Sequence, residues 1–217
     1  MRLKVLGSGS SGNCYILENE NEALIIEAGL PFMEVKKALD FNVMKIKAVI
    51  TTHFHTDHSL YSLQYVQAGI PVFEPCRQPI KDSEMRFRKG NFDIRAFENR
   101  DKSGRWLHNN GDGSECPCVG FYITHPDMGS LVYATDTEYV KWRFKDINHI
   151  MVEANYDDAE IQAKIAEKKL NGEYIYELGV LHNHMSLAKI NDWLYANMGP
   201  NSAYIYMHCH QDKEGST

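Results

Sequence analysis

Long apolar runs are missing from this 217-residue sequence: no window comes near the roughly 18 apolar residues that a membrane helix needs. The first residues, Met1 to Leu6, are predicted to form a strand and are too few for the apolar region of a signal peptide. The number of cysteines, five, is odd, and a chain of this length can form a stable core without disulfide bonds. Reduced thiols are therefore expected instead of a disulfide framework. These absences predict a cytoplasmic protein without membrane contact.

Two ligand motifs are present only in incomplete form. Cys116-Pro117-Cys118 lacks the two-residue spacer of a zinc knuckle. The glycine-serine stretch 7–13 lacks the Gly-Lys-Ser/Thr ending of a Walker motif, so it is either a phosphate-binding loop or a plain tight turn between strands.

The composition is that of a folded protein, with 43% hydrophobic and 11% aromatic residues and a net charge of −6. No linker or low-complexity segment divides the chain, so residues 1–217 are expected to form one domain. Apolar runs and helical spacing alternate in a β-α-β rhythm. The expected strands are residues 3–6, 14–17, 23–27, 48–50, 71–73, 119–124, 131–134, 147–152 and 203–207; the expected helices are 31–39, 60–66, 158–170 (with Ile161, Ile165 and Leu170 inward) and one through 190–194.

The stretch Thr51-Thr52-His53-Phe54-His55-Thr56-Asp57-His58 follows the apolar run 48–50 and carries four ligand-type side chains. Imidazole and carboxylate groups suit divalent cations such as Zn, Fe or Mn. Side chains two apart on an extended chain share a direction, so His53 and His55 can hold one ion while Asp57 and His58 turn toward a second. A histidine-rich polar loop is the alternative, but crowding four such groups after a buried strand would be costly.

Other side chains that could bind metal or act in catalysis follow later strands. Asp136 comes after the strand 131–134, and the strand 203–207 leads into His208 and His210. Strand ends are common positions for metal and catalytic groups, because the strand is rigid and its end is open to solvent. His184 lies in a loop that leads into a helix.

Together these residues resemble the metallo-β-lactamase superfamily. Stretches 7–13, 26–30, Val152-Glu153-Ala154-Asn155-Tyr156-Asp157 and His184-Met185-Ser186 more narrowly resemble its WalJ/YycJ-type branch, over residues 3 to about 210. The resemblance implies an α/β (α+β) fold, a four-layer αββα sandwich with a dinuclear site at one edge, and 5′-to-3′ DNA exonuclease activity. The chain departs from the family in having Glu27 where relatives have Asp, and Tyr156 where the branch has histidine.

Carried over by position, His53, His55 and His108 resemble the ligands of one metal, and Asp57 and His58 those of the other. Asp136 resembles the bridging carboxylate, and a terminal histidine, His208 with His210 as substitute, completes the second site. His184 is then left to act on the substrate, unless it only caps the helix that follows. Glu27, Thr52 or Glu153 could orient the imidazoles.

Two divalent ions (Zn, Mn or Fe) would lower the pKa of a bridging water and stabilise charge on the attacked centre, which predicts a metal-dependent hydrolase with Asp57 and His184 in catalytic roles. The expected substrate is a phosphodiester, with DNA first and a cyclic nucleotide second. A thioester or lactone hydrolase and a non-catalytic binding protein are the alternatives. The oligomeric state is left open.

Residues 77–105 are locally basic, with nine Lys or Arg and five acids. The stretch is either solvated surface or a surface that binds an anionic substrate. Replacing Arg86, Arg88 and Lys89 by Ala would distinguish the two. An overall charge of −6 argues against tight non-specific binding of DNA.

Overall fold

The computed structural model describes residues 1–77 and 85–208 and contains two sheets packed face to face. The first sheet has the strand order β1-β2-β3-β4-β5 and the second the order β11-β10-β9-β8-β7-β6. The first comprises β1 (Arg2–Gly7), β2 (Cys14–Glu18), β3 (Ala23–Ile26), β4 (Ile46–Ile50) and β5 (Val72–Phe73). The second comprises β6 (Arg86–Lys89), β7 (Phe92–Glu98), β8 (Val119–His125), β9 (Gly129–Ala134), β10 (Ile147–Glu153) and β11 (Met198–Met207).

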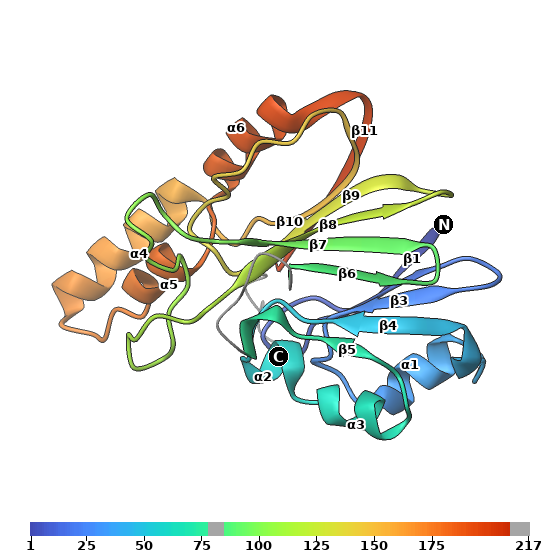
Figure 1. Ribbon diagram of the computed structural model, residues 1–217. Helices are drawn as coiled ribbons and strands as arrows, with labels where there is room; N and C mark the ends of the chain where they lie inside the picture. The colour runs from blue at the N-terminus through green and yellow to red at the C-terminus, as the bar shows by residue number, and fades with distance from the viewer. Residues whose placement is uncertain (78–84, 209–217) are drawn as a thin grey trace, which may run out of the picture.

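Helices cover the outer faces of both sheets (Figure 1). Helices α1 (Phe32–Ala38), α2 (Thr56–Ser59) and α3 (Ser62–Gln67) lie below the first sheet in this view. Helix α6 (Leu187–Asn197) lies over the second sheet, and α4 (Asp158–Asn171) and α5 (Glu177–Asn183) lie beyond one end of it. The predicted α/β sandwich with helix, sheet, sheet and helix layers is therefore confirmed.

Period-two alternation along the strands accounts for the layers. On β2, Tyr15 and Leu17 point into the core between the sheets, whereas Cys14 and Ile16 pack against α1 and α3. On β10, Met151 faces the same inter-sheet core and Val152 faces α6. Central strands such as β2 and β10 thus have two apolar faces, which is why they read as continuous apolar runs in the sequence.

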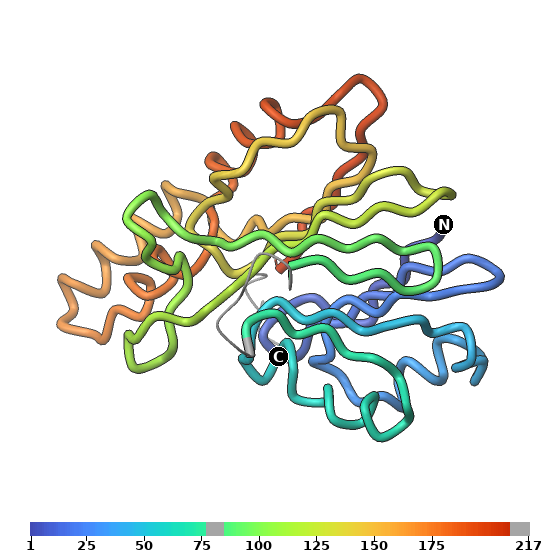
Figure 2. Tube along the Cα trace, in the orientation of Figure 1, coloured from blue at the N-terminus to red at the C-terminus, as the bar shows by residue number. Residues whose placement is uncertain are grey.

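Strand direction places the chemistry at one edge of the sandwich. Strands β3, β4 and β5 are parallel, and so are β9, β10 and β11. The carboxyl ends of parallel strands meet at the same edge of a sheet, so the segments that follow β4, β9, β10 and β11 are brought together. The chain trace in Figure 2 shows these strand ends converging on one side of the molecule.

The structure corrects several predicted elements. Helix α4 buries Ile161, but Leu170 is 89% exposed, so the prediction that Leu170 faces inward was wrong. Its single buried residue shows that α4 packs on a narrow stripe near its N-terminus. The predicted helix 60–66 corresponds to α3, and the short helix α2 before it, the hairpin β6–β7 and helix α5 were not predicted. Strand β3 ends at Ile26, because Glu27 has a left-handed φ of 65°.

Glu18, at the end of β2, is a buried charge compensated by three cations. Its side chain is 3% exposed and forms ion pairs with Arg2, Lys4 and Lys45. Burial would raise the pKa of this carboxyl, but the three cations hold it at about 2.

Within the described residues, no helix combines the length and apolar character needed to cross a membrane.

Candidate metal centre

The His-x-His-x-Asp-His stretch forms a sharp turn between β4 and α2. His53 follows the end of β4, His55 is the residue before α2, and Asp57 and His58 lie on that helix. Gly29 allows the turn to pack closely, because a Cβ at this position would lie 1.8 Å from the Asp57 carbonyl oxygen. The Asn13 N–H donates to the same carbonyl oxygen over 2.7 Å. The loop after β1 therefore holds the turn in place.

The first ligand group consists of His53, His55 and His108, whose nitrogens lie within 4.8 Å of one another. The ring centroids are all 4.7 Å apart in pairs. His55 Nδ1 and His108 Nε2 are separated by 3.1 Å, close to the roughly 3.4 Å between two nitrogens on a tetrahedral ion with bonds of about 2.0–2.1 Å. His108 comes from the loop between β7 and β8, so two segments far apart in sequence complete the group.

A hydrogen-bond chain fixes the tautomer of His53. The Thr52 hydroxyl donates to Glu27 Oε1 over 2.7 Å, so its oxygen is left to accept from His53 Nδ1–H at 2.9 Å. Nε2 of His53 then carries a lone pair, and this buried atom has no hydrogen-bond partner among the described residues. An imidazole aimed in this way by a threonine and a carboxylate is typical of a metal ligand.

The second ligand group surrounds His58 Nε2. This atom lies 3.0 Å from Asp136 Oδ2, 3.3 Å from Asp57 Oδ2 and 3.1 Å from the Asn13 side-chain nitrogen. His58 Nδ1 lies 3.3 Å from Glu27 Oε1. His53, His58 and Asp136 also qualify as a possible metal group, so Asp136 connects this group to the first.

A third group, on the far side of Asp136, contains Glu153, His184 and His208. Glu153 Oε1 lies 2.5 Å from His184 Nδ1 and 3.0 Å from His208 Nδ1. The same two nitrogens lie 3.3 Å and 3.7 Å from Asp136 Oδ1. Glu153 is fully buried and also accepts the backbone N–H of Asp136 over 2.8 Å, so one carboxylate positions three of the candidate site residues.

Three residues of the site have a strained backbone conformation. Glu27, Asp136 and His208 have φ values of 65°, 49° and 53°, in the left-handed region that non-glycine residues rarely adopt. Each follows the end of a strand, β3, β9 or β11. Such conformations persist where the surrounding structure over-determines them and are frequent at functional sites.

The electrostatics of the first group suit cation binding. Burial, together with the neighbouring histidines, lowers the pKa of His53 well below its usual value. Burial also lowers the pKa of His108, to about 4. Both rings are therefore neutral at physiological pH, as metal ligation requires.

The carboxylates of the other groups are held in their ionised form. Burial alone would raise the pKa of Asp136, but His208 and His58 hold it well below its usual value. In turn, although burial opposes it, Glu153 and Asp136 raise the pKa of His184 to about 9. Buried carboxylates at this density require positive charge nearby, so the donor set fits divalent cations.

All seven predicted ligands are brought to one edge of the sandwich: His53, His55, Asp57, His58, His108, Asp136 and His208. His184 joins them through Glu153, and His210 lies outside the described residues. The three proposed orienting residues all contact site histidines, Thr52 at His53, Glu27 near His58 and Glu153 at His184 and His208.

Two asparagines at the site were not predicted. Asn13 contacts Asp57 and His58, and Asn110 Oδ1 lies 3.2 Å from His55 Nε2. Asn13 ends the glycine-serine loop, which the sequence singled out for another reason. Asn110 sits in a polar loop that offers no local signal.

The polar groups of the glycine-serine loop form hydrogen bonds within the protein. Its N–H groups at Gly9, Gly12 and Asn13 are hydrogen-bonded internally, and the Ser8 hydroxyl accepts from the His208 N–H over 3.0 Å. These contacts favour the tight-turn interpretation over a phosphate-binding loop.

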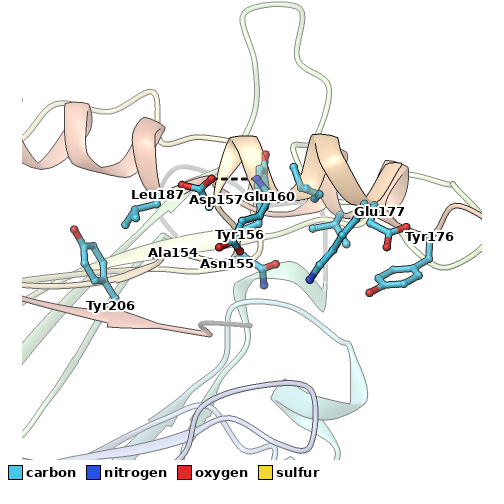
Figure 3. Close-up of a pocket in the computed structure, with 12 residues that line it drawn as sticks. Ala154, Asn155, Tyr156, Asp157, Glu160, Tyr176, Glu177, Leu187 and Tyr206 are labelled. Carbon is cyan, nitrogen blue, oxygen red and sulfur yellow. Dashed lines mark hydrogen bonds between the residues drawn. The ribbon is translucent and has the colours of Figure 1, made fainter. Parts of the chain in front are cut away.

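Tyr156, which replaces a histidine of the related branch, does not reach the ligand groups. It lines a separate cavity of about 270 Å³ behind the segment that carries His184. Figure 3 shows Tyr156 and Asn155 in this cavity beside Asp157, whose side chain caps α4. The substitution therefore leaves the candidate ligands intact.

The turn of the basic hairpin β6–β7 lies at the opposite end of the sandwich from the ligand groups. Arg86 and Arg88 both form ion pairs with Asp93. The hairpin turn contacts Glu22, through Asn91, at the end of the sandwich where β3 begins, opposite the ends of β3 and β4. The geometry favours solvated surface for Arg88 and Lys89.

Comparison with known proteins agrees with this description. Residues 7–133 match the family model for the metallo-beta-lactamase superfamily. Exodeoxyribonuclease WalJ of Streptococcus pneumoniae is 26% identical over 199 residues, covering 84% of this chain and 72% of the relative. Exodeoxyribonuclease YycJ of Bacillus anthracis is 24% identical over 173 residues, covering 72% of this chain and 64% of the relative.

Solved structures show the same fold. The metallo-beta-lactamase fold protein YhfI from Bacillus subtilis superimposes with a TM-score of 0.64 at 16% identity, over 95% of this chain and 85% of that one. The short form of human tRNase Z does so with a TM-score of 0.60 at 15% identity, over 96% and 92%. The chain belongs to the metallo-beta-lactamase superfamily, a superfamily of hydrolases that normally bind divalent metals.

Proposed function

We propose that this protein is a dinuclear metal-dependent phosphodiesterase that acts on DNA. The observation that carries the proposal is the position of Asp136, which shares one possible metal group with His53 and His58 and another with His184 and His208, so its carboxylate reaches donors proposed for both ions. A carboxylate between two donor sets is what a two-ion site requires. We infer further that residues 1–217 act as one hydrolase domain, since both sheets contribute ligands.

In this proposal, His53, His55 and His108 hold one ion. Asp57, His58 and His208 hold the second, and Asp136 is shared. The ions are Zn, Mn or Fe, because mixed histidine and carboxylate ligation does not discriminate strongly among them. When bound, two divalent ions activate water and neutralise the charge that develops on the attacked phosphorus.

The remaining steps fall to the protein's own side chains. Asp57 is 20% exposed at its side chain, so its carboxylate can both bind and accept a hydrogen bond from the attacking water. His184 is 19% exposed at its side chain, and Glu153 engages its Nδ1. Nε2 is the nitrogen left to donate a proton to the leaving oxygen, and the Glu153 carboxylate beside Nδ1 stabilises the protonated ring.

The choice of DNA over other phosphodiesters is supported by the relatives, two of which are exodeoxyribonucleases. A substrate panel tests it: 5′-phosphorylated DNA, a cyclic nucleotide, a thioester and a lactone, each with Mn and with Zn. Hydrolysis of DNA, lost in Asp136→Ala, supports the proposal. Preferential turnover of the cyclic nucleotide would replace the substrate, and turnover of the thioester or lactone alone would overturn the reaction class.

A further inference from the structure

A second basic segment lies outside the hairpin β6–β7. Residues 141–145 read Lys-Trp-Arg-Phe-Lys and lie in the irregular segment between β9 and β10. Its two aromatics, Trp142 and Phe144, line the same cleft, and Lys141 Nζ lies over the Trp142 ring, 5.1 Å from its centroid. Lys141, Arg143 and Lys145 are exposed, and none forms an ion pair with another residue in the described ranges. They differ in this from Arg86 and Arg88, which Asp93 neutralises.

The aromatic residues of this segment border an open cleft of about 700 Å³ on the outer face of β7 and β8. Trp142 and Phe144 line it together with Phe97, Tyr122 and Arg95. The Phe144 ring stacks on Tyr122 with an interplanar angle of 7°. Trp142 is 42% exposed, so much of its ring surface is in contact with solvent. Arg95 is exposed and makes no ion pair within the described part of the chain, which adds a fourth cation to the rim.

The cleft begins next to the metal centre. The segment starts five residues after Asp136, and Glu138 N–H donates to the carbonyl oxygen of Leu107, the residue before His108. Trp142 Nε1 donates to the carbonyl oxygen of Glu98, whose strand partner is Val119. The Val119 N–H in turn donates to the carbonyl oxygen of Thr52, the residue before His53. Backbone contacts thus connect this surface to the residues that precede His53 and His108.

We propose that this surface, residues 141–145 with Arg95, Phe97 and Tyr122, binds the single-stranded part of a nucleic acid substrate. The proposal rests on the proposed function and adds the form in which the substrate is held. Exposed cations without a carboxylate partner match a phosphate backbone, and an exposed aromatic ring at the cleft matches an unstacked base. A duplex offers the same phosphates but keeps its bases stacked, so the aromatic residues of the surface favour a single strand.

The test measures binding by the metal-loaded protein of a fluorescent, hydrolysis-resistant phosphorothioate oligonucleotide, single-stranded or annealed, over a range of salt concentrations. The variant Lys141→Gln/Arg143→Gln/Lys145→Gln removes the three cations and breaks no ion pair within the described residues, although it also removes the contact of Lys141 with the Trp142 ring. If each cation meets one phosphate, its Kd at 0.1 M salt rises by about 100-fold and the salt dependence falls by about two counterions. Trp142→Leu should weaken single-strand binding by roughly tenfold while changing duplex binding much less.

The matched control is Lys36→Gln/Lys37→Gln/Lys47→Gln, which changes the net charge equally but lies on α1 and β4 of the other sheet. It should leave the Kd close to that of the unaltered protein. Equal weakening in both triple variants, or equal effects on single strand and duplex, would overturn the proposal, as would a lack of oligonucleotide binding by the unaltered protein.

Turnover of the small ester bis(4-nitrophenyl) phosphate separates this proposal from the proposed function. The triple variant at residues 141–145 should retain this turnover in full. Absent turnover in the unaltered protein would count against the phosphodiesterase assignment, whereas a selective loss of oligonucleotide binding would still establish the surface.

Discussion

Replacing Thr52 by Ala should weaken metal binding although Thr52 is not itself a ligand. The hydroxyl of Thr52 is the link between Glu27 and His53 Nδ1, at 2.7 Å and 2.9 Å. Both partners are buried, with exposures of 0% and 1%, so water cannot replace the hydroxyl. Without it, His53 loses the acceptor that fixes its tautomer and keeps Nε2 free for the ion.

The magnitude follows from these contacts. Loss of a group that orients a metal-bound histidine typically costs 10- to 100-fold in metal affinity, which corresponds to about 1.4–2.7 kcal/mol. Two buried polar groups left without their partner should also lower the free energy of unfolding of the metal-free protein by about 1–3 kcal/mol. Competition with a chromophoric chelator measures the first effect, and denaturant unfolding in EDTA measures the second.

Thr52→Ser is the matched control, because it keeps the hydroxyl and removes one methyl group. It should bind metal within a few-fold of the unaltered protein. An Ala variant with unchanged metal affinity, or a Ser variant as impaired as the Ala variant, would refute the orienting role of the hydroxyl.

Three further predictions follow from the same geometry. Asp136→Ala should lose activity and at least one ion while staying folded, and full metal retention measured by elemental analysis would remove the shared-ligand assignment. His184→Ala should lower kcat by roughly 10²-fold with metal content unchanged, whereas His208→Ala should lose metal; the reverse pattern would exchange the two roles. Because the folded-state pKa of Glu18 is depressed to about 2, its stabilisation is complete above about pH 4.5 and is lost as the pH falls toward 2. Glu18→Gln should therefore be less stable by about 1–2 kcal/mol at pH 7, allowing for solvent screening around Arg2, and equal in stability near pH 2, as measured by urea unfolding.

Much of the fold could be predicted from local patterns. The strands that became β2, β4, β9 and β10 are apolar runs bounded by turns, and their positions were predicted to within about two residues. The hairpin β6–β7 was missed because Arg86, Arg88 and Arg95 face solvent at an edge of the sheet. With so many charged residues, the period-two pattern of apolar side chains is difficult to recognise in the sequence. Leu170 was misplaced because helical spacing shows only which side chains share a face of the helix. Whether that face is buried depends on the elements packed against it, and at the end of α4 Leu170 remains exposed.

The candidate site divides in the same way. His53, His55, Asp57 and His58 are close in sequence, so spacing alone brought them together. His108 was reached only through the family resemblance, whereas Asp136 was first indicated by its position after a strand and was assigned as a shared ligand through the resemblance. Asn13 could be placed at the site only once the chain had folded, because it meets Asp57 across 44 residues of sequence.

The choice between His184 and His208 shows where sequence reasoning ends. Position after a rigid strand favours His208 as the ligand, yet both rings place Nδ1 beside Asp136, and the His184 distance is the shorter, 3.3 Å against 3.7 Å. Glu153 engages both rings, so their roles depend on which nitrogen each presents to the metal.

Metal stoichiometry of the purified protein tests the two-ion centre most directly. Elemental analysis of the unaltered chain, after reconstitution with Zn or Mn and removal of unbound ions, should give close to two ions per chain. One ion per chain that persists unchanged in Asp136→Ala, or none at all, would contradict it.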